Sequence, residues 1–176
     1  MAENDSATDG GASLHDADIE IDPALFRRVM GHYPTGVTVV ASLDGDRPVG
    51  LAIGSFFSVS LEPPLVLFCA AKSSSTWPRI QSAGKWAANI LGEDDEEVCR
   101  LFAEKGADRF AHMTFRPGAS GAPLLDRSLA FFDCVTDAEY DAGDHVVVVG
   151  RVLELGYQSE GKPLLFYRGG YGRYEI

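Results

Sequence analysis

Residues 35–61 read TGVTVVASLDGDRPVGLAIGSFFSVSL, and this stretch decides the fold. Its first nine residues are rich in β-branched side chains, which favour extended strands. Asp44-Gly45-Asp46 is a turn signal, and the return strand is expected from Pro48 to Leu61. The stretch therefore predicts a β-hairpin, and the fold around it is expected to be mainly β.

Most of the elements predicted outside this hairpin are strands as well. We expect strands at residues 65–71, 85–91, 129–140, 145–157 and 164–167, the first of them buried on both faces. Short helices are expected at residues 78–82 and 93–105. So many strands and so few helices predict a closed or partly closed barrel rather than a doubly wound parallel sheet.

A further helix is predicted just before the hairpin. Asp22 is a suitable N-cap, Pro23 suits the first helical position, and Pro34 stops the run. The apolar residues between them recur at helical spacing, and this apolar stripe is expected to enter the core.

The chain of 176 residues suits one domain, which we expect at residues 22–176 after an acidic tail at residues 1–21. The tail region through Asp22 holds seven acidic residues and no Lys or Arg, which accounts for most of the net charge of −11. The remainder is only mildly acidic and has no basic cluster, so a nucleic-acid partner is not expected.

Cysteine and histidine spacing argues against a metal site. Cys69, Cys99 and Cys134 lie far apart in apolar surroundings and are expected to be buried reduced thiols. The four histidines show no metal-ligand spacing. No secretory signal or membrane span is evident, and a cytoplasmic location without membrane association is expected.

The segment Gly50 to Ser60 is the first candidate binding surface. Alternation along a strand would place Gly50, Ala52, Gly54, Phe56, Ser58 and Ser60 on one face. Small side chains would let a flat ring approach the backbone there. In the alternative interpretation the glycines mark a bulge or a tight corner and the serines face water.

Other segments carry candidate ligand-binding residues, each with a simpler alternative. Residues 72–76 offer four hydroxyls and an ammonium that suit a phosphate, although polar loops are common. Arg109 beside Phe110 suits a phosphate or a ring, or else a surface ion pair and a core residue. His145 opens a strand as a nicotinamide contact or as a simple strand-end residue. The Gly-rich segment around Tyr171 is a stacking lid or a frayed end. No GxGxxG follows a first strand, so any dinucleotide is held without that motif.

Taken together in their order along the chain, the segments resemble the flavin reductase family with the split FMN-binding barrel. Members of this family are the reductase components of two-component monooxygenases. The resemblance covers roughly Phe26 to Tyr174. It is carried by PTGVTVV (34–40), PVG (48–50), SF (55–56), SVSLEPP (58–64), SSSTW (73–77), NIL (89–91), DRF (108–110), GAPLL (121–125), GDH (143–145) and PLL (163–165).

This resemblance implies a mainly β, split, Greek-key-like FMN-binding barrel and an NAD(P)H:flavin oxidoreductase. A hydride would pass from NADH or NADPH to FMN or FAD, and a homodimer would supply reduced flavin to a partner monooxygenase. The protein would hold the two rings together and exclude water rather than provide a nucleophile or a metal. A non-enzymatic flavin-binding or electron-carrier protein on the same barrel is the alternative. A barrel oxidase acting on pyridoxine phosphate is a more distant one.

The resemblance also implies the site residues. The flavin ring would lie against Thr35, Gly36 and Val37 and against Ala52, Ile53, Gly54 and Ser55. Phosphate contacts would come from Ser58, Val59, Ser60, Ser73, Ser74 and Ser75, with Arg109 and Phe110 nearby. His145 would border the nicotinamide as the catalytic contact, with Tyr171 as a further cofactor contact. Relatives often carry Thr-Val-Asn-Ser where this chain has residues 52–55, AIGS, which leaves the choice between FMN and FAD open.

Overall fold

A computed structural model describes residues 20–104 and 108–175 of the chain. The elements are α1 (Pro23–Met30), β1 (Thr35–Gly36), β2 (Thr38–Asp44), β3 (Arg47–Ile53), β4 (Phe57–Leu61), β5 (Pro64–Ala71), α2 (Trp77–Ala83), β6 (Lys85–Ile90), α3 (Glu96–Ala103), β7 (Phe115–Pro117), β8 (Pro123–Leu125), β9 (Ala130–Ala142), β10 (His145–Tyr157), β11 (Leu164–Tyr167) and β12 (Gly170–Arg173).

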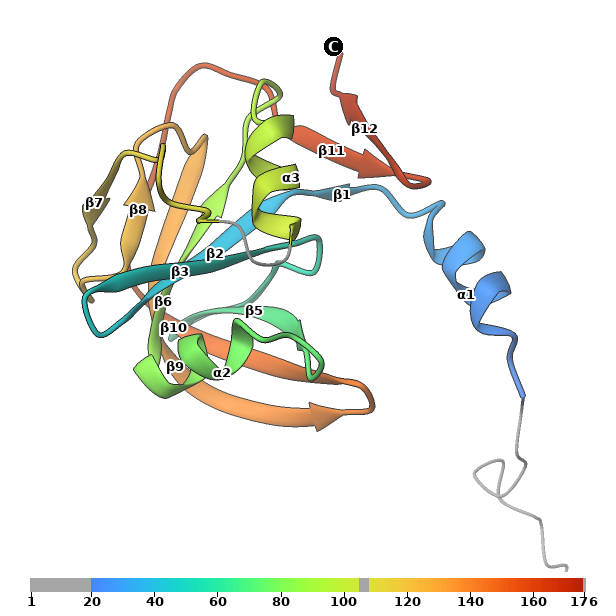
Figure 1. Cartoon of the computed structure of the whole chain (residues 1–176), viewed down its shortest axis with the longest axis horizontal. Coiled ribbons are helices and arrows are strands. Elements are labelled where there is room, and N and C mark those ends of the chain that lie inside the picture. Colours follow the sequence, from blue (N-terminus) through green and yellow to red (C-terminus); the bar gives the residue numbers. More distant parts are fainter. Residues whose placement is uncertain (1–19, 105–107, 176) are drawn as a thin grey trace, which may run out of the picture.

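Seven strands form one antiparallel sheet in the order β3-β2-β6-β9-β10-β5-β4 (Figure 1). The two edge strands, β3 and β4, follow each other in the chain but do not pair, so the sheet curls without closing. Small sheets of β1-β11-β12 and β7-β8 complete the fold. The prediction of a mainly β, split barrel is confirmed.

The hairpin at residues 35–61 begins as predicted. β2 has five consecutive buried residues, Thr38 to Ser42, because both of its faces are covered. The turn into β3 is made at Gly45, whose φ of +60° suits a residue without a side chain. The long β9–β10 hairpin turns in the same way at Gly143, with φ of +63°.

The interior consists of two main hydrophobic clusters on opposite faces of β2. One cluster surrounds Trp86 and Phe68, whose rings meet edge to face at 4.9 Å. The other contains Val39, Leu91 and Phe102, which places α3 over the outer face of the sheet. The two clusters fix the positions of β3, β5 and α3.

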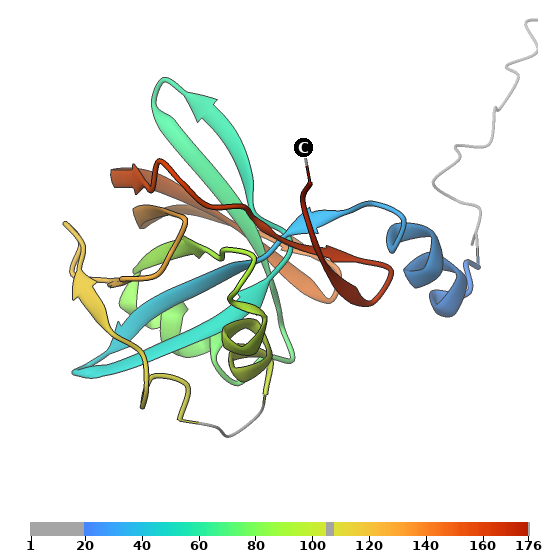
Figure 2. The same cartoon turned by 90° about the horizontal axis from the view of Figure 1, so that it is seen from above.

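The prediction that the apolar stripe of α1 enters the core is wrong. The helix begins as expected, since the Asp22 carboxylate accepts hydrogen bonds from the backbone N–H groups of Ala24 (2.9 Å) and Leu25 (3.2 Å). None of its residues is buried, and Phe26 and Val29 are 58% and 61% exposed. Figures 1 and 2 show α1 projecting away from the barrel beyond β1. Helical periodicity reveals a face that needs a partner but not which partner covers it.

The single strand predicted from Pro48 to Leu61 is also wrong, because the chain leaves the sheet after Ile53 and re-enters it at the opposite edge. The Ser55 hydroxyl binds the backbone of β5 instead: it accepts from the N–H of Cys69 (3.0 Å) and donates to its carbonyl (3.3 Å). Such a side-chain bond replaces a ladder bond and permits the break. Phe56 consequently packs on the first cluster rather than sharing a face with Ala52.

Smaller differences concern other predicted elements. β5 alternates between buried and half-buried residues rather than being buried on both faces. The segment around Tyr171 is neither frayed nor free, because β12 pairs with β11. The helix predicted at residues 93–105 begins only at Glu96, and β7 and β8 were not predicted. The predicted acidic tail falls largely on residues 1–19, outside the described residues. Within the described ranges, each helix is too short to cross a bilayer.

Candidate active site

A cleft of about 440 Å³ opens where β3 ends, a volume within the range of small-molecule sites. Its walls come from β3, the ends of β5 and α3, the loop after β5, Arg109 and the start of β10. Nine of the predicted site residues line it: Ala52, Ile53, Gly54, Ser55, Ser73, Ser74, Ser75, Arg109 and His145. The fold thus brings together four segments that are far apart in the sequence.

Sequence reasoning missed several residues of this cleft: Leu51, Cys69, Ala71, Phe102 and Ala103. Thr76, which also lines it, belongs to the candidate phosphate segment at residues 72–76. Cys69 and Ala71 were assigned to a strand buried on both faces, whereas β5 turns this pair of residues toward the cleft and Phe68 and Ala70 toward the core. LVLFCAA is apolar throughout, so its sequence did not distinguish the two faces, although side chains of any strand alternate between them.

Thr35, Gly36 and Val37 lie beside the cleft rather than in its wall. A side chain at Gly54 would lie 2.8 Å from the Thr35 hydroxyl and 3.8 Å from the Gly36 carbonyl, so this segment borders the cleft at Gly54. Val37 is buried in the second cluster, and its carbonyl accepts from the N–H of Leu91 (2.9 Å).

Five other predicted residues lie outside the cleft. Ser58, Val59 and Ser60 are on β4 at the opposite edge of the sheet. Phe110 lines a neighbouring groove instead. The Tyr171 hydroxyl lies 3.2 Å from the Cys99 sulfur on α3, and the Arg100 guanidinium covers the Tyr171 ring at 4.9 Å.

The strand edge at β3 provides free backbone groups. The Gly50 carbonyl accepts a bond from Arg109 (2.6 Å), so it points away from β2 toward the open edge. Backbone groups of alternate strand residues point the same way, so the N–H and C=O of Ala52 also face this edge. A donor and an acceptor beside a methyl side chain suit the polar edge of a planar heterocycle.

The serine hydroxyls of the loop after β5 have two different roles. Ser74 accepts from the N–H groups of Thr76 and Trp77, both at 3.2 Å, which fixes the loop. Ser73 and Ser75 are exposed and make no side-chain hydrogen bond within the described residues. Their hydroxyls are therefore the ones available to a ligand.

Arg109 is the central cation of the site. Its guanidinium donates to the Gly50 carbonyl (2.6 Å), the Thr76 hydroxyl (2.9 Å) and the Glu104 carbonyl (2.6 and 3.2 Å). Desolvation lowers the pKa of Arg109. The side chain still stays charged, because the ordinary pKa of arginine is very high. No carboxylate pairs with it among residues 20–104 and 108–175, so its charge is available to an anion.

His145 borders the cleft with one ring nitrogen already bound. Nδ1 lies 2.7 Å from the Asp144 carboxylate, and this contact holds the pKa of Asp144 below its usual value. Lys72 fixes the same turn, since its backbone N–H donates to the Asp144 carbonyl (3.0 Å). A ring with its proton on Nδ1 leaves Nε2 available to a ligand in the cleft.

A flavin fits these residues by shape and by donor set. Ala52, Gly54 and Ala71 leave room for a flat ring against β3, and the hydroxyls of Ser73 and Ser75 with Arg109 suit a phosphate at the other end. His145 stands on the β5–β10 side of the same cleft, opposite Ala71 in the sheet.

Comparisons with known proteins agree with this chemistry. A family model described as a flavin reductase like domain matches residues 30–175. A flavin reductase from Pseudomonas putida is 47% identical over 153 residues, 86% of this chain and 90% of the relative. A flavin-dependent monooxygenase reductase subunit, HsaB, from Mycobacterium tuberculosis is 45% identical over 154 residues, 86% of this chain and 82% of that one. The solved structure of the NADH:FAD oxidoreductase SgcE6 from Streptomyces globisporus, in complex with NAD and FAD fragments, matches with a TM-score of 0.83 at 35% identity, covering 88% of this chain and 93% of that one.

Proposed function

The chain belongs to the flavin reductase family, and we propose that it is an NAD(P)H:flavin oxidoreductase that reduces FMN or FAD and supplies the reduced flavin to a partner monooxygenase. The observation that carries this proposal is the single cleft that joins a free strand edge, two free hydroxyls, an unpaired guanidinium and His145. A flavin held there would supply the acceptor for the hydride of the nicotinamide.

The protein's own contribution is to bind and orient. The backbone groups of Ala52 hold the ring edge, Ser73, Ser75 and Arg109 hold the phosphate, and Phe102 excludes water from one side. Hydride transfer needs no protein nucleophile, because rate comes from holding the reacting atoms close together and dry. His145 orients the nicotinamide carboxamide through Nε2, a role that a pure electron carrier would not need.

The proposal is tested by following the oxidation of NADH and NADPH, through the absorbance of the reduced nicotinamide, with and without added FMN or FAD. We expect oxidation to rise and saturate with added flavin, because the open cleft exchanges its ligand. A protein that binds flavin but leaves both nicotinamides unoxidised would instead be a carrier.

Ser75→Ala is expected to raise the KM for FMN about tenfold and to leave the KM for riboflavin unchanged. A lost hydrogen bond to a charged group costs about 1.5–3 kcal/mol, and riboflavin lacks the phosphate. Ser58→Ala is the matched control, because Ser58 lies outside the cleft. Equal effects of the two substitutions, measured by steady-state kinetics, would refute phosphate binding by the loop after β5.

His145→Ala is expected to raise the KM for NADH about tenfold and to leave the flavin Kd near the wild-type value. The variant loses one oriented hydrogen bond to the carboxamide. The low pKa of Asp144 keeps its carboxylate charged throughout the neutral range, so it can accept from Nδ1 of His145 there. Kinetics with NADH and flavin fluorescence titration measure the two constants. Unchanged NADH kinetics would make His145 a strand-end residue.

Cys69 is expected to be the one cysteine that iodoacetamide modifies in the native protein. Bound flavin is expected to slow this reaction about tenfold or more, because it keeps the reagent out of the cleft. Burial raises the pKa of Cys99, and it raises that of Cys134 to about 12, whereas Cys69 lines the cleft. Intact-mass spectrometry counts the adducts. Modification of Cys134 before Cys69 would contradict the orientation of β5.

We also propose a homodimer in which the apolar face of α1 packs on a second copy. The helix projects from its own barrel (Figure 2). Its apolar side chains are exposed, and beside it lies a mostly apolar groove of about 570 Å³ that includes Phe166. A two-fold axis would cover both copies of this face at once. Light scattering after size exclusion should give a dimer, and Phe26→Asp with Val29→Asp should give a monomer. A monomeric wild type would refute the proposal.

A cytoplasmic location is proposed as well. All three cysteines are free thiols, which suits a reducing compartment, and the proposed substrate NAD(P)H is generated there.

A further inference from the structure

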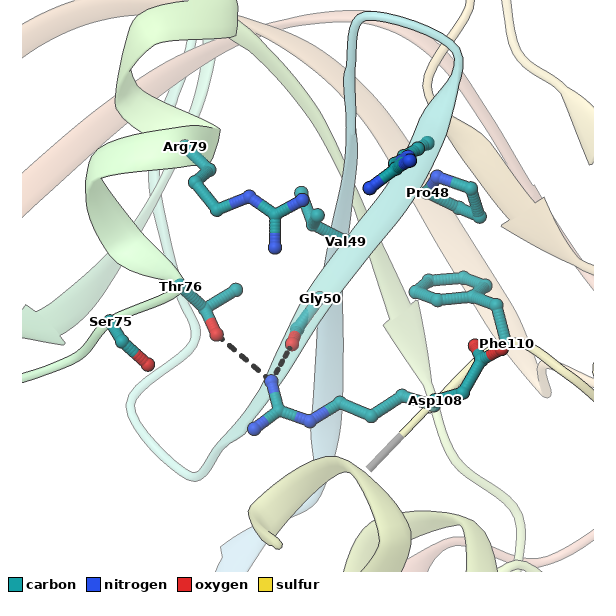
Figure 3. A pocket seen from close by; sticks show the side chains of 10 residues that line it. Pro48, Val49, Gly50, Ser75, Thr76, Arg79, Asp108 and Phe110 are labelled. Atoms are coloured by element: carbon teal, nitrogen blue, oxygen red, sulfur yellow. Dashed lines mark hydrogen bonds between the residues drawn. The ribbon is translucent and has the colours of Figure 1, made fainter. Parts of the chain in front are cut away.

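A second groove of about 630 Å³ adjoins the cleft, and Figure 3 shows the side chains that line this groove. It is lined by Arg47, Pro48, Val49, Gly50, Ser75, Thr76, Arg79, Asp108, Arg109 and Phe110. Ser75, Thr76 and Arg109 also line the cleft, so the two spaces adjoin along a shared wall. One extended ligand could therefore occupy both.

The groove carries a small excess of positive charge in an acidic chain. Three guanidiniums, from Arg47, Arg79 and Arg109, line it against one carboxylate, that of Asp108, in a protein of net charge −11. The Nε of Arg79 donates to Asp44 (2.7 Å), and Arg47 has no ion pair within the described part of the chain. This excess of cations suits a ligand with phosphate groups.

Part of the lining is apolar and comes from Pro48, Val49 and Phe110. Val49 and Phe110 are buried, and the Phe110 ring is fixed edge to face by Phe102 (5.1 Å) and Phe115 (5.7 Å). In Figure 3 the Phe110 ring lies beside Pro48, while Arg79 reaches in from α2 on the other side. A rigid aromatic wall facing guanidiniums suits a purine base joined to phosphate.

We propose that this groove binds the adenylate half of FAD while the cleft holds the flavin half, so that FAD binds more tightly than FMN. The inference rests on the proposed function, because it takes the cleft to be the flavin site. Arg109, between the two spaces, then faces the diphosphate, and Arg47 and Arg79 hold the adenylate end.

The test compares FAD with FMN in the double variant Arg47→Gln and Arg79→Gln. We expect the Kd for FAD, from flavin fluorescence, to rise about tenfold or more, with FMN changing less than about twofold, because FMN lacks the adenylate. Arg151→Gln is the matched control, since Arg151 is an exposed arginine on β10 that pairs with Asp137. Arg47→Gln alone, which breaks no ion pair in the described structure, serves if the double variant unfolds.

Competition by AMP gives a second readout on the unmodified protein. AMP should displace FAD but leave bound FMN in place, and the double variant should lose this competition. Equal weakening of FAD and FMN, or an increase confined to the KM for NADH, would overturn the inference, the second by assigning the groove to the nicotinamide dinucleotide. A wild type that binds FAD more tightly than FMN but oxidises no NADH would refute the proposed function and leave the groove assignment standing.

Discussion

Replacing Arg109 with methionine is expected to raise the Kd for flavin about a hundredfold and to lower the thermal unfolding midpoint. Its guanidinium joins Gly50 on β3, Thr76 before α2 and Glu104 after α3, the three segments around the cleft. A charged hydrogen bond from the guanidinium to the flavin phosphate would contribute about 1.5–3 kcal/mol to binding. The carbonyls of Gly50 and Glu104 would also lose their donor, which lowers stability. A loss of about 2.7 kcal/mol in binding corresponds to the hundredfold change.

Arg109→Lys separates charge from geometry. Lysine keeps the positive charge but cannot donate to all three acceptors at once, because its ammonium lacks the planar fork of a guanidinium. We therefore expect the lysine variant to recover only a small part of the affinity. Flavin titration and thermal unfolding measure both effects. Wild-type affinity in the lysine variant would show that the charge alone matters and that the three-point attachment does not.

The fold was predictable where one physical signal dominates. The β-branched run at residues 37–40 and the turn at Gly45 specify the first hairpin without help from the rest of the chain. The same holds for the β9–β10 hairpin, which turns at Gly143 and places His145 at the start of a strand. Local periodicity and turn chemistry are enough in both places.

The failures occur where a side chain replaces a regular contact or where the partner lies elsewhere. The alternation from Gly50 to Ser60 suggested one continuous binding face, but the Ser55 hydroxyl binds the backbone of β5 and splits the strand. Ser58 was thereby moved to the far edge of the sheet. Likewise, the apolar stripe of α1 was assigned to a core that this helix never reaches. No local pattern encodes these choices.

The site was only partly predictable for a similar reason. Hydroxyls, an arginine and a histidine mark the candidate segments, and the fold brings the chosen residues of four segments into one cleft. Arg109 lines both spaces, whereas its neighbour Phe110 lines only the second groove, and their adjacency in the sequence did not show this difference.

Gly150→Ala is expected to destabilise the protein by about 3 kcal/mol or more, which is a fall of roughly 10 °C in the unfolding midpoint for a domain of this size. A methyl group at Gly150 would overlap Cζ2 of Trp86 and lie 2.8 Å from its Cη2. The indole cannot move aside easily, since Trp86 is fully buried, packs on Phe68 and donates from Nε1 to the Thr136 hydroxyl (3.3 Å).

A second substitution should rescue this loss in part. Trp86→Phe removes the two ring atoms that collide with the new methyl group, so the double variant should be more stable than Gly150→Ala alone, although Trp86→Phe by itself is destabilising. Thermal and urea unfolding of the four proteins gives the coupling energy. Additive effects would show that the methyl group is accommodated by the strand rather than by the ring. Because β10 begins at His145, five residues before Gly150, a strand that shifts should also raise the KM for NADH, and the rescue should restore it together with the stability.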